Sequence, residues 1–266
     1  MTLLEQYLQD KRPLGQLLET ALAEDSLDPD EFAQTSGAIC VLHARGSRDV
    51  LDAARALAKS LDAKCRALAA RILGELGCPH RSFPEECCDA LLDLMKNDAC
   101  SDVVIAAIYA LGHLGNRRAD LGLAALAAHP ASAVRRGVAF ALNGTISPDA
   151  VRALLQLMQD PNPETRDWAA CAIAHKAEID GADIREALLK GTQDRDAYVR
   201  GEALFGLALR RDRRTVPLLI SELSRPRPSN GRAQQVYDAV CALFDVDEEE
   251  RSDAEWLEAL RRPPIH

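Results

Sequence analysis

The chain carries many residues of the types that bind metal ions. It contains eight cysteines and six histidines. No two cysteines form a CxxC pair, and no cysteine and histidine show the spacing of a zinc site. We therefore expect free thiols that pack as small apolar side chains, in a reducing compartment, with no bound metal and no cofactor.

The spacing of the nucleophilic and phosphate-binding residue types points to no catalytic site either. No glycine-rich loop follows a strand, and no serine or cysteine has histidine and aspartate at a spacing that indicates an activated nucleophile. Adjacent Cys87 and Cys88 fall within a helical stretch, which indicates packing between helices. We assign no catalytic residue from the sequence.

The elements that carry these residues are predicted to be helices. Only 4% of the residues are aromatic, while alanine and leucine are abundant, and this composition favours close-packed helices over sheets. The longest apolar run, at 103–112, is about half the length of a membrane span, and the acidic start does not resemble a signal peptide. We expect a cytoplasmic protein. Its net charge of −9 argues against general nucleic-acid binding.

An internal repeat organises the chain. Leucine-like anchor residues recur at intervals of 31 to 38 residues, at Leu42, Leu73, Leu111, Leu142, Ile173 and Leu207. Between successive anchors lies a second amphipathic stretch, and the two helical stretches are joined by a polar turn rich in Asp, Asn, Ser and Pro. Each unit is therefore a helical hairpin that cannot bury its apolar face alone. We count about seven hairpins.

The second helix of each hairpin resembles the HEAT and HEAT-like (PBS-lyase-type) repeat family. The matching residues are the leading pairs Val134-Arg135 and Val199-Arg200, the small pair Ala69-Ala70, and the closing pairs Leu73-Gly74 and Leu111-Gly112. The resemblance implies an all-α fold, a right-handed α-solenoid over residues 31–244. Capping helices at 1–30 precede it, and an acidic C-terminal cap or tail at 245–266 follows. Val104 and Thr35 replace the arginine, which interrupts the row of arginines there.

Two structural roles are expected for the repeated residues. The closing glycines should let neighbouring second helices approach closely, which offsets a cost of about 1 kcal/mol in helix propensity at each. The repeated arginine should bind carboxylates or carbonyls at an adjacent turn. We expect Asp62 to pair with Arg66, and Asp196 with Arg200.

The surface left for a function is the row of side chains opposite the core, which is expected to line a concave face. Rings at Tyr109, Phe140 and Phe205 either anchor a partner or fill space against the next repeat, and both interpretations are open. His113 and His175 are too far apart to share one metal ion. The residues predicted to contact a partner on this face are Arg71, Tyr109, His113, Arg136, Phe140, Asp167, Trp168 and Phe205.

Charged residues mark a second candidate surface. Arg210, Arg211, Arg213 and Arg214 cross one turn between repeats and predict a basic edge, and the acidic stretch 245–260 follows. In one interpretation the acidic tail caps the solenoid and neutralises these arginines. In the other, the edge or the tail docks a charged partner.

The predicted function is binding of another protein, without catalysis. The partner would contact the concave face and the charged edges, and the acidic balance favours a basic partner. Two versions are an adaptor or scaffold and a bacterial immunity-type inhibitor that occludes a basic toxin. Nucleic acid and membranes are disfavoured as partners, and a monomer is favoured.

The resemblance leaves an enzymatic alternative. HEAT-like alkylpurine DNA glycosylases hold a damaged base with a carboxylate and aromatic rings on this face, which makes Asp167 and Trp168 the candidates. Adjacent residues on a helix diverge by about 100°, however, so these two do not face the same point. Phycobilin lyases of the same repeat class are a second possibility. Deoxyhypusine hydroxylases use His-Glu dipeptides, which this chain lacks.

Overall fold

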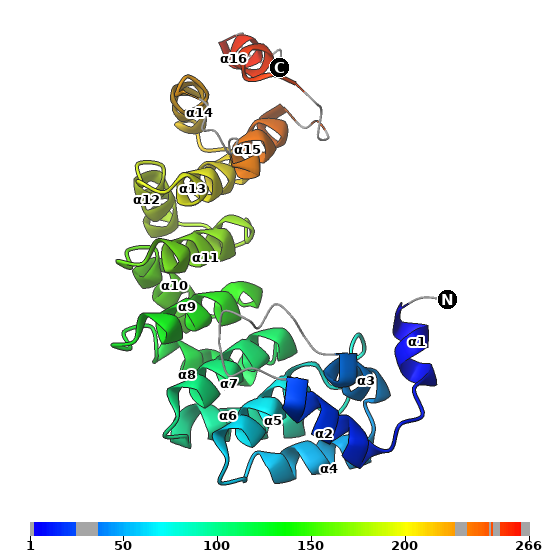
Figure 1. Cartoon of the computed structure of the whole chain (residues 1–266). Coiled ribbons are helices and arrows are strands. Elements are labelled where there is room, and N and C mark those ends of the chain that lie inside the picture. The colour runs from blue at the N-terminus through cyan, green and yellow to red at the C-terminus, as the bar shows by residue number, and fades with distance from the viewer. Residues whose placement is uncertain (1–2, 25–36, 227–232, 245, 247–250, 262–266) are drawn as a thin grey trace. The chain divides into compact units, whose positions relative to one another are not determined.

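The computed structural model describes residues 3–24, 37–226, 233–244, 246 and 251–261, and every regular element among them is helical (Figure 1). The α-helices are α1 (Leu3–Gln9), α2 (Leu14–Glu24), α3 (Gly37–Arg45), α4 (Arg48–Leu57), α5 (Ala63–Glu75), α6 (Pro84–Asn97), α7 (Ser101–Leu114), α8 (Asp120–Ala124), α9 (Ser132–Ala141), α10 (Pro148–Leu157), α11 (Pro163–Ala174), α12 (Ala182–Gly191), α13 (Ala197–Leu209), α14 (Thr215–Leu223), α15 (Gln234–Phe244) and α16 (Asp253–Arg261). The all-α prediction is confirmed.

The helices from α2 to α15 pair as seven hairpins, as the repeat spacing predicts. In each hairpin an even-numbered first helix packs against the odd-numbered second helix that follows it. The first helix α8 has only five residues, and residues 117–119 form a 3₁₀ turn before it. The chain is thus an α-solenoid of stacked hairpins. Its right-handed sense stays a prediction.

The solenoid divides into two compact units, residues 1–145 and 146–266. In the first unit the second helices α3, α5, α7 and α9 stack in chain order, and in the second unit α11, α13 and α15 do the same. The predicted division at residues 30 and 244 stays a prediction. No described helix is both long and apolar enough to cross a bilayer.

The anchor residues form the core of both units. All six are at most 2% exposed, and Ala110, Ala172, Ala174 and Ala208, which adjoin anchors on the second helices, are buried as well. Cys87 and Cys88 are buried in α6, as expected, and all eight cysteines are free thiols.

Glycine at the closing position lets second helices come within backbone contact. A β-carbon at Gly74 would lie 2.8 Å from the Cα of Ala110, and one at Gly112 would lie 2.7 Å from the Cα of Ala141. Real β-carbons do not approach other atoms this closely, so any side chain here would push the helices apart. The predicted role of these two glycines is confirmed.

The repeated arginine joins two neighbouring hairpins. The Nη1 atom of Arg66 donates to the carbonyls of Ser60 and Leu61, both at 3.0 Å, in the turn of its own hairpin. Its Nε and Nη2 atoms grip the carboxylate of Asp98, in the turn of the next hairpin, at 2.5 and 3.0 Å. This carboxylate is 4% exposed, so the contact is well shielded from water.

The second unit repeats the same arrangement. Arg166 binds the carbonyls of its own turn and the carboxylate of Asp194, with both side-chain hydrogen bonds at 2.8 Å. Arg200 likewise binds its own turn and, through Nε and Nη2, the buried carboxylate of Glu222.

The carboxylate partners therefore differ from the predicted ones. Asp62 and Asp196 do not pair with the arginines four residues later. Each is the N-cap of its second helix and accepts hydrogen bonds from backbone N–H groups, such as Lys64 N at 2.9 Å and Tyr198 N at 2.8 Å. The expectation of carbonyl partners at a turn is confirmed.

The C-terminal helix α16 closes the last hairpin of the second unit. It packs on α14 and buries Trp256 and Leu260 in the core around α15. The rings of Trp256 and Phe244 stack at 6.4 Å. Residues 245 and 247–250, which carry much of the acidic tail's charge, lie outside the described residues.

Replacing Arg66 with alanine should destabilise the protein by about 2–3 kcal/mol, because Asp98 would then be a buried carboxylate without its cation. Chemical denaturation measures the change. The matched control is Arg118→Ala, since Arg118 pairs with exposed Glu85 and Asp89 and should cost less than about 1 kcal/mol. Equal losses in both variants would contradict a special role for the repeated arginine.

The contact also predicts a pH dependence. Hydrogen bonds from Arg66 lower the pKa of Asp98, which outweighs the opposing effect of burial. Its stabilising contribution is therefore complete above the unfolded pKa of about 4 and is lost as the pH falls through the lower folded pKa. Asp98→Asn keeps an oxygen for the backbone N–H of Cys100. It should destabilise the protein at pH 7 and much less near pH 2. A constant difference across this range would refute the assignment.

Candidate functional site

The candidate site is the exposed side of the second helices, here called the second-helix face. Its residues lie two positions before the anchors, and all six of them are half-buried. In the first unit these are Cys40, Arg71, Tyr109 and Phe140, and in the second unit they are Cys171 and Phe205. Neither interpretation of the rings is therefore sufficient alone, because each ring packs on a neighbour and also reaches the surface.

Three rings meet in the first unit. Tyr109 on α7 lies 5.0 Å from Phe140 on α9, and His113 lies 5.2 Å from Phe140 in an edge-on contact. Such pairs favour offset or edge-to-face geometry and hold the rings rigid. The predicted residue Arg136 precedes Phe140 by one helical turn and is half-buried. The cluster offers a rigid aromatic surface between two hairpins.

A pocket of about 80 Å³ adjoins this cluster, lined by residues of α3, α5 and α7. Glu75 lies in it between two imidazoles, with one carboxylate oxygen 3.2 Å from His113 Nδ1 and the other 3.8 Å from His43 Nδ1. Burial lowers the pKa of His43, and burial lowers that of Arg71 to about 10. The pocket thus mixes basic and acidic groups with apolar walls and accommodates only a small group.

The second unit brings together residues that the sequence left apart. Asp167, Cys171 and His175 are spaced by four residues on α11 and so share one side of that helix. Glu202 of α13 faces them, and its carboxylate lies 3.5 Å from His175 Nε2. Phe205, one turn further along α13, packs on the His175 ring at 4.9 Å. Trp168, which is predicted to contact a partner, lies next to Asp167 and is half-buried.

Burial dominates the acid–base properties of this group. It raises the pKa of Asp167 to about 6 and, with the charge of Asp167 adding to the effect, that of Glu202 to about 7. It also raises the pKa of the Cys171 thiol to about 12 and lowers that of His175. Three acidic groups are therefore held close together at buried or half-buried positions, beside the half-exposed imidazole of His175. Their geometry suits a cation.

Glu75 and Glu202 are the residues that the sequence reasoning missed. Each is a carboxylate within the small and apolar residues of a second helix, in RILGE and RGEALFG. A charged residue within such an apolar stretch is the signal in the sequence that could have identified these two positions. The histidines that they contact come from neighbouring hairpins, so no local spacing reveals the pairing.

The predicted basic edge is partly wrong. Arg210 is buried, and its side chain is fully shielded from solvent. It donates to five backbone carbonyls at 2.8–3.1 Å, those of Ile173, Ala174, Lys176, Ile179 and Gly206. These include carbonyls at the end of α11 that have no partner within that helix, which explains why a cation lies beneath them.

The other three arginines of the edge differ in their surroundings. Arg213 is exposed, and Arg211 is exposed while donating to the carbonyl of Leu243 at 3.0 Å. Arg214 forms ion pairs with Asp212 at 2.9 Å and Glu186 at 2.6 Å. The charge of Arg214 is thus balanced locally by two carboxylates, and the edge is less basic than its sequence suggests.

Comparisons with known proteins place this geometry in context. A family model described as HEAT repeats matches residues 50–136 and 120–183. Protein YibA of Escherichia coli K12 is 38% identical over 92 residues, which are 35% of this chain and 32% of YibA. The match therefore spans about a third of the length of this curated relative.

Solved structures show a similar fold at low identity. The X-ray structure of E. coli YibA gives a TM-score of 0.68 at 23% identity, covering 98% of this chain and 96% of that one. An archaeal HEAT-like repeats protein from Thermococcus onnurineus gives 0.55 at 14% identity, covering 95% and 99%. A chain of the S. pombe condensin Cnd3-Cnd2 subcomplex gives 0.58 at 18%, covering 91% and 37%.

The buried position of Arg210 gives a sharp prediction. Arg210→Ala should cost about 3 kcal/mol or more, because five carbonyls lose a donor in a site closed to water. The matched change Arg213→Ala, in the same turn but exposed, should alter stability by less than about 0.5 kcal/mol. Thermal denaturation of the two variants measures the difference. If Arg210→Ala leaves the stability unchanged, Arg210 would instead belong to the exposed basic edge.

Proposed function

The chain belongs to the HEAT repeat family, and from that premise we propose that it is a non-catalytic protein that binds a partner protein through its second-helix face. The observation that carries the proposal is the cluster of Tyr109, His113 and Phe140 in the first unit. These rings are held by one another at 5.0–5.2 Å and remain accessible to solvent. A rigid, partly exposed aromatic cluster loses little entropy on binding, which is typical of interface anchors.

The charge of the molecule favours a basic partner. The net charge of the chain is −9. A basic surface would be attracted over long range and would bind less tightly as the ionic strength rises. An adaptor in an assembly and an inhibitor that occludes a basic toxin both fit this chemistry. The condensin relative shows that one protein of this fold is found in a subcomplex with another protein.

Replacing Tyr109 and Phe140 together with alanine should weaken partner binding by at least about tenfold, because the central rings of an interface carry much of its energy. The 266-residue chain is used as bait in a lysate of the organism from which it comes. The captured protein is then purified, and its binding is measured by titration. Since both rings are half-buried, His113→Ala is made as well: its side chain is 47% exposed, so folding should be unaffected.

The matched control is the pair Leu61→Ala and Leu121→Ala, two exposed apolar residues outside the second-helix face. These changes should leave the affinity within about twofold of the original. Helical circular dichroism and melting temperature establish that each variant is folded. If the control pair abolishes binding while the ring variants retain it, the partner binds elsewhere and the proposal fails.

A further inference from the structure

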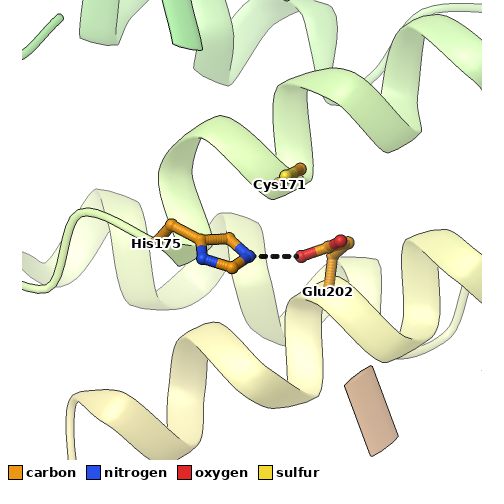
Figure 2. A group of neighbouring side chains, drawn as sticks. All are labelled: Cys171, His175 and Glu202. Carbon is orange, nitrogen blue, oxygen red and sulfur yellow. Dashed lines mark ion pairs between the residues drawn. The ribbon is translucent and has the colours of Figure 1, made fainter. Parts of the chain in front are cut away.

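The second unit holds a cluster of three side chains whose donor atoms converge. Cys171 and His175 lie one turn apart on α11, and Glu202 reaches toward them from α13 (Figure 2). The thiol sulfur, an imidazole nitrogen and a carboxylate oxygen all lie within 4.8 Å of one another. Among the described residues this is the one group of three or more such side chains that meets so closely.

The separation of the imidazole and carboxylate donors matches that of two ligands around one small ion, and the thiol sulfur lies within 4.8 Å of both. In a tetrahedral zinc site, with ligand bonds of about 2.0–2.3 Å, neighbouring donor atoms lie roughly 3.3–3.8 Å apart. His175 Nε2 and Glu202 Oε2 are already 3.5 Å apart. That distance is long for a hydrogen bond between them but suits two ligands on adjacent corners of a tetrahedron.

The buried carboxylate supplies an independent reason to expect a cation. The Glu202 side chain is 5% exposed, and the Cys171 thiol lies against its carboxylate. The Oε2 atom, which faces His175, accepts no hydrogen bond of ordinary length and angle. Its other oxygen accepts one from Gln235 Nε2 at 2.9 Å. Asp167 lies nearby on the Cys171 side of α11, and its buried Oδ1 atom also has no partner.

No lysine or arginine in the described part of the chain forms a hydrogen bond or an ion pair with these carboxylates. Neither Glu202 nor Asp167 is bonded to a lysine or arginine there, and the nearby charge of Asp238 is negative as well. Buried carboxylates elsewhere in this fold, such as Asp98 and Glu222, are each held by an arginine. A bound cation would supply at Glu202 what arginine supplies at those sites.

We propose that Cys171, His175 and Glu202 form a binding site for one divalent transition-metal ion of the zinc type. Thiolate, imidazole and carboxylate together are a donor set typical of zinc rather than of calcium or magnesium, which bind oxygen atoms. The ion enters from the solvent side, where His175 is half-exposed, and the Cys171 proton leaves to solvent on binding. Three protein ligands leave a fourth position for water or for a side chain of a partner.

The first unit provides a natural comparison. His113 occupies the position equivalent to His175 and contacts Glu75 at 3.2 Å, but Tyr109 stands where the second unit has Cys171. This pair therefore lacks the sulfur ligand. It has a similar histidine–carboxylate contact without the third donor, which makes it a matched control within the same chain.

The test is to titrate the 266-residue chain with Co²⁺ after a chelator has removed any bound metal, and then to add Zn²⁺ as a competitor. Binding should give one equivalent per chain, with the intense visible bands of four-coordinate cobalt and a thiolate-to-cobalt charge-transfer band, and Zn²⁺ should displace it. Isothermal titration with Zn²⁺ then gives the affinity. Zn²⁺ should also raise the melting temperature, since it binds only the folded state.

Cys171→Ser should abolish the charge-transfer band. His175→Gln and Glu202→Gln should each weaken Zn²⁺ binding by at least about 10–100-fold, a loss that even outer-shell partners of a metal can cause. The double change His113→Gln with Glu75→Gln, and Cys65→Ser as a thiol control, should leave stoichiometry and affinity unchanged. Circular dichroism without metal establishes that every variant is folded.

Two results would overturn the proposal. One is the absence of a stoichiometric cobalt spectrum in the original chain. The other is metal binding that survives in folded Cys171→Ser and Glu202→Gln variants, or that is lost equally in the His113 and Glu75 control. In either case Glu202 would not be a metal ligand. Partner binding through the first unit would be unaffected by this outcome.

Discussion

The contact of one arginine with its own turn and with a carboxylate of the next hairpin is the interaction that fixes the stacking at three pairs of hairpins. A single hairpin has an apolar face that it cannot bury alone, and hydrophobic packing fixes no rotation between neighbours. The rotation is fixed by three arginines, Arg66, Arg166 and Arg200. Each planar guanidinium binds carbonyls in its own turn and a carboxylate of the next hairpin. Since these carboxylates are shielded from water, the geometry is held more strictly than in a surface ion pair.

This arrangement determines which side chains are free for a function. The core face is filled by anchors and alanines, and the glycines allow second helices to meet along their backbones. What remains is the row of half-buried residues on the second-helix face, whose identities are not constrained by stacking. In the first unit the row carries the rings of Tyr109 and Phe140, and in the second unit its residue Cys171 lies beside His175 and the buried carboxylate of Glu202. One scaffold thus presents two different chemistries.

The sequence predicted the features that arise within one hairpin. The anchor spacing, the seven hairpins and the role of Gly112 all follow from local periodicity, and each agrees with the structure. The sequence could not identify partners between hairpins. Asp98 lies 32 residues from Arg66, and Asp62, which is closer in sequence, is already engaged as a helix cap.

The sequence predicted only some of the residues of the candidate site. The ring positions in the row were identified from their offset to the anchors, and the structure places Tyr109 beside Phe140 in the first unit, whereas Phe205 of the second unit packs on His175. The buried arginine was missed because the carbonyls that it binds belong to two different helices. The cluster of Cys171, His175 and Glu202 was missed because Glu202 approaches from the next second helix, 27 residues after His175 in the sequence.

The most direct test of the account is a double-mutant cycle between Arg166 and Asp194, measured by chemical denaturation of Arg166→Ala, Asp194→Ala and the double variant. The account predicts a coupling energy of about 1–3 kcal/mol between the two residues, since both hydrogen bonds join different hairpins in a shielded position. A coupling energy below about 0.3 kcal/mol, with the single effects simply adding, would contradict it.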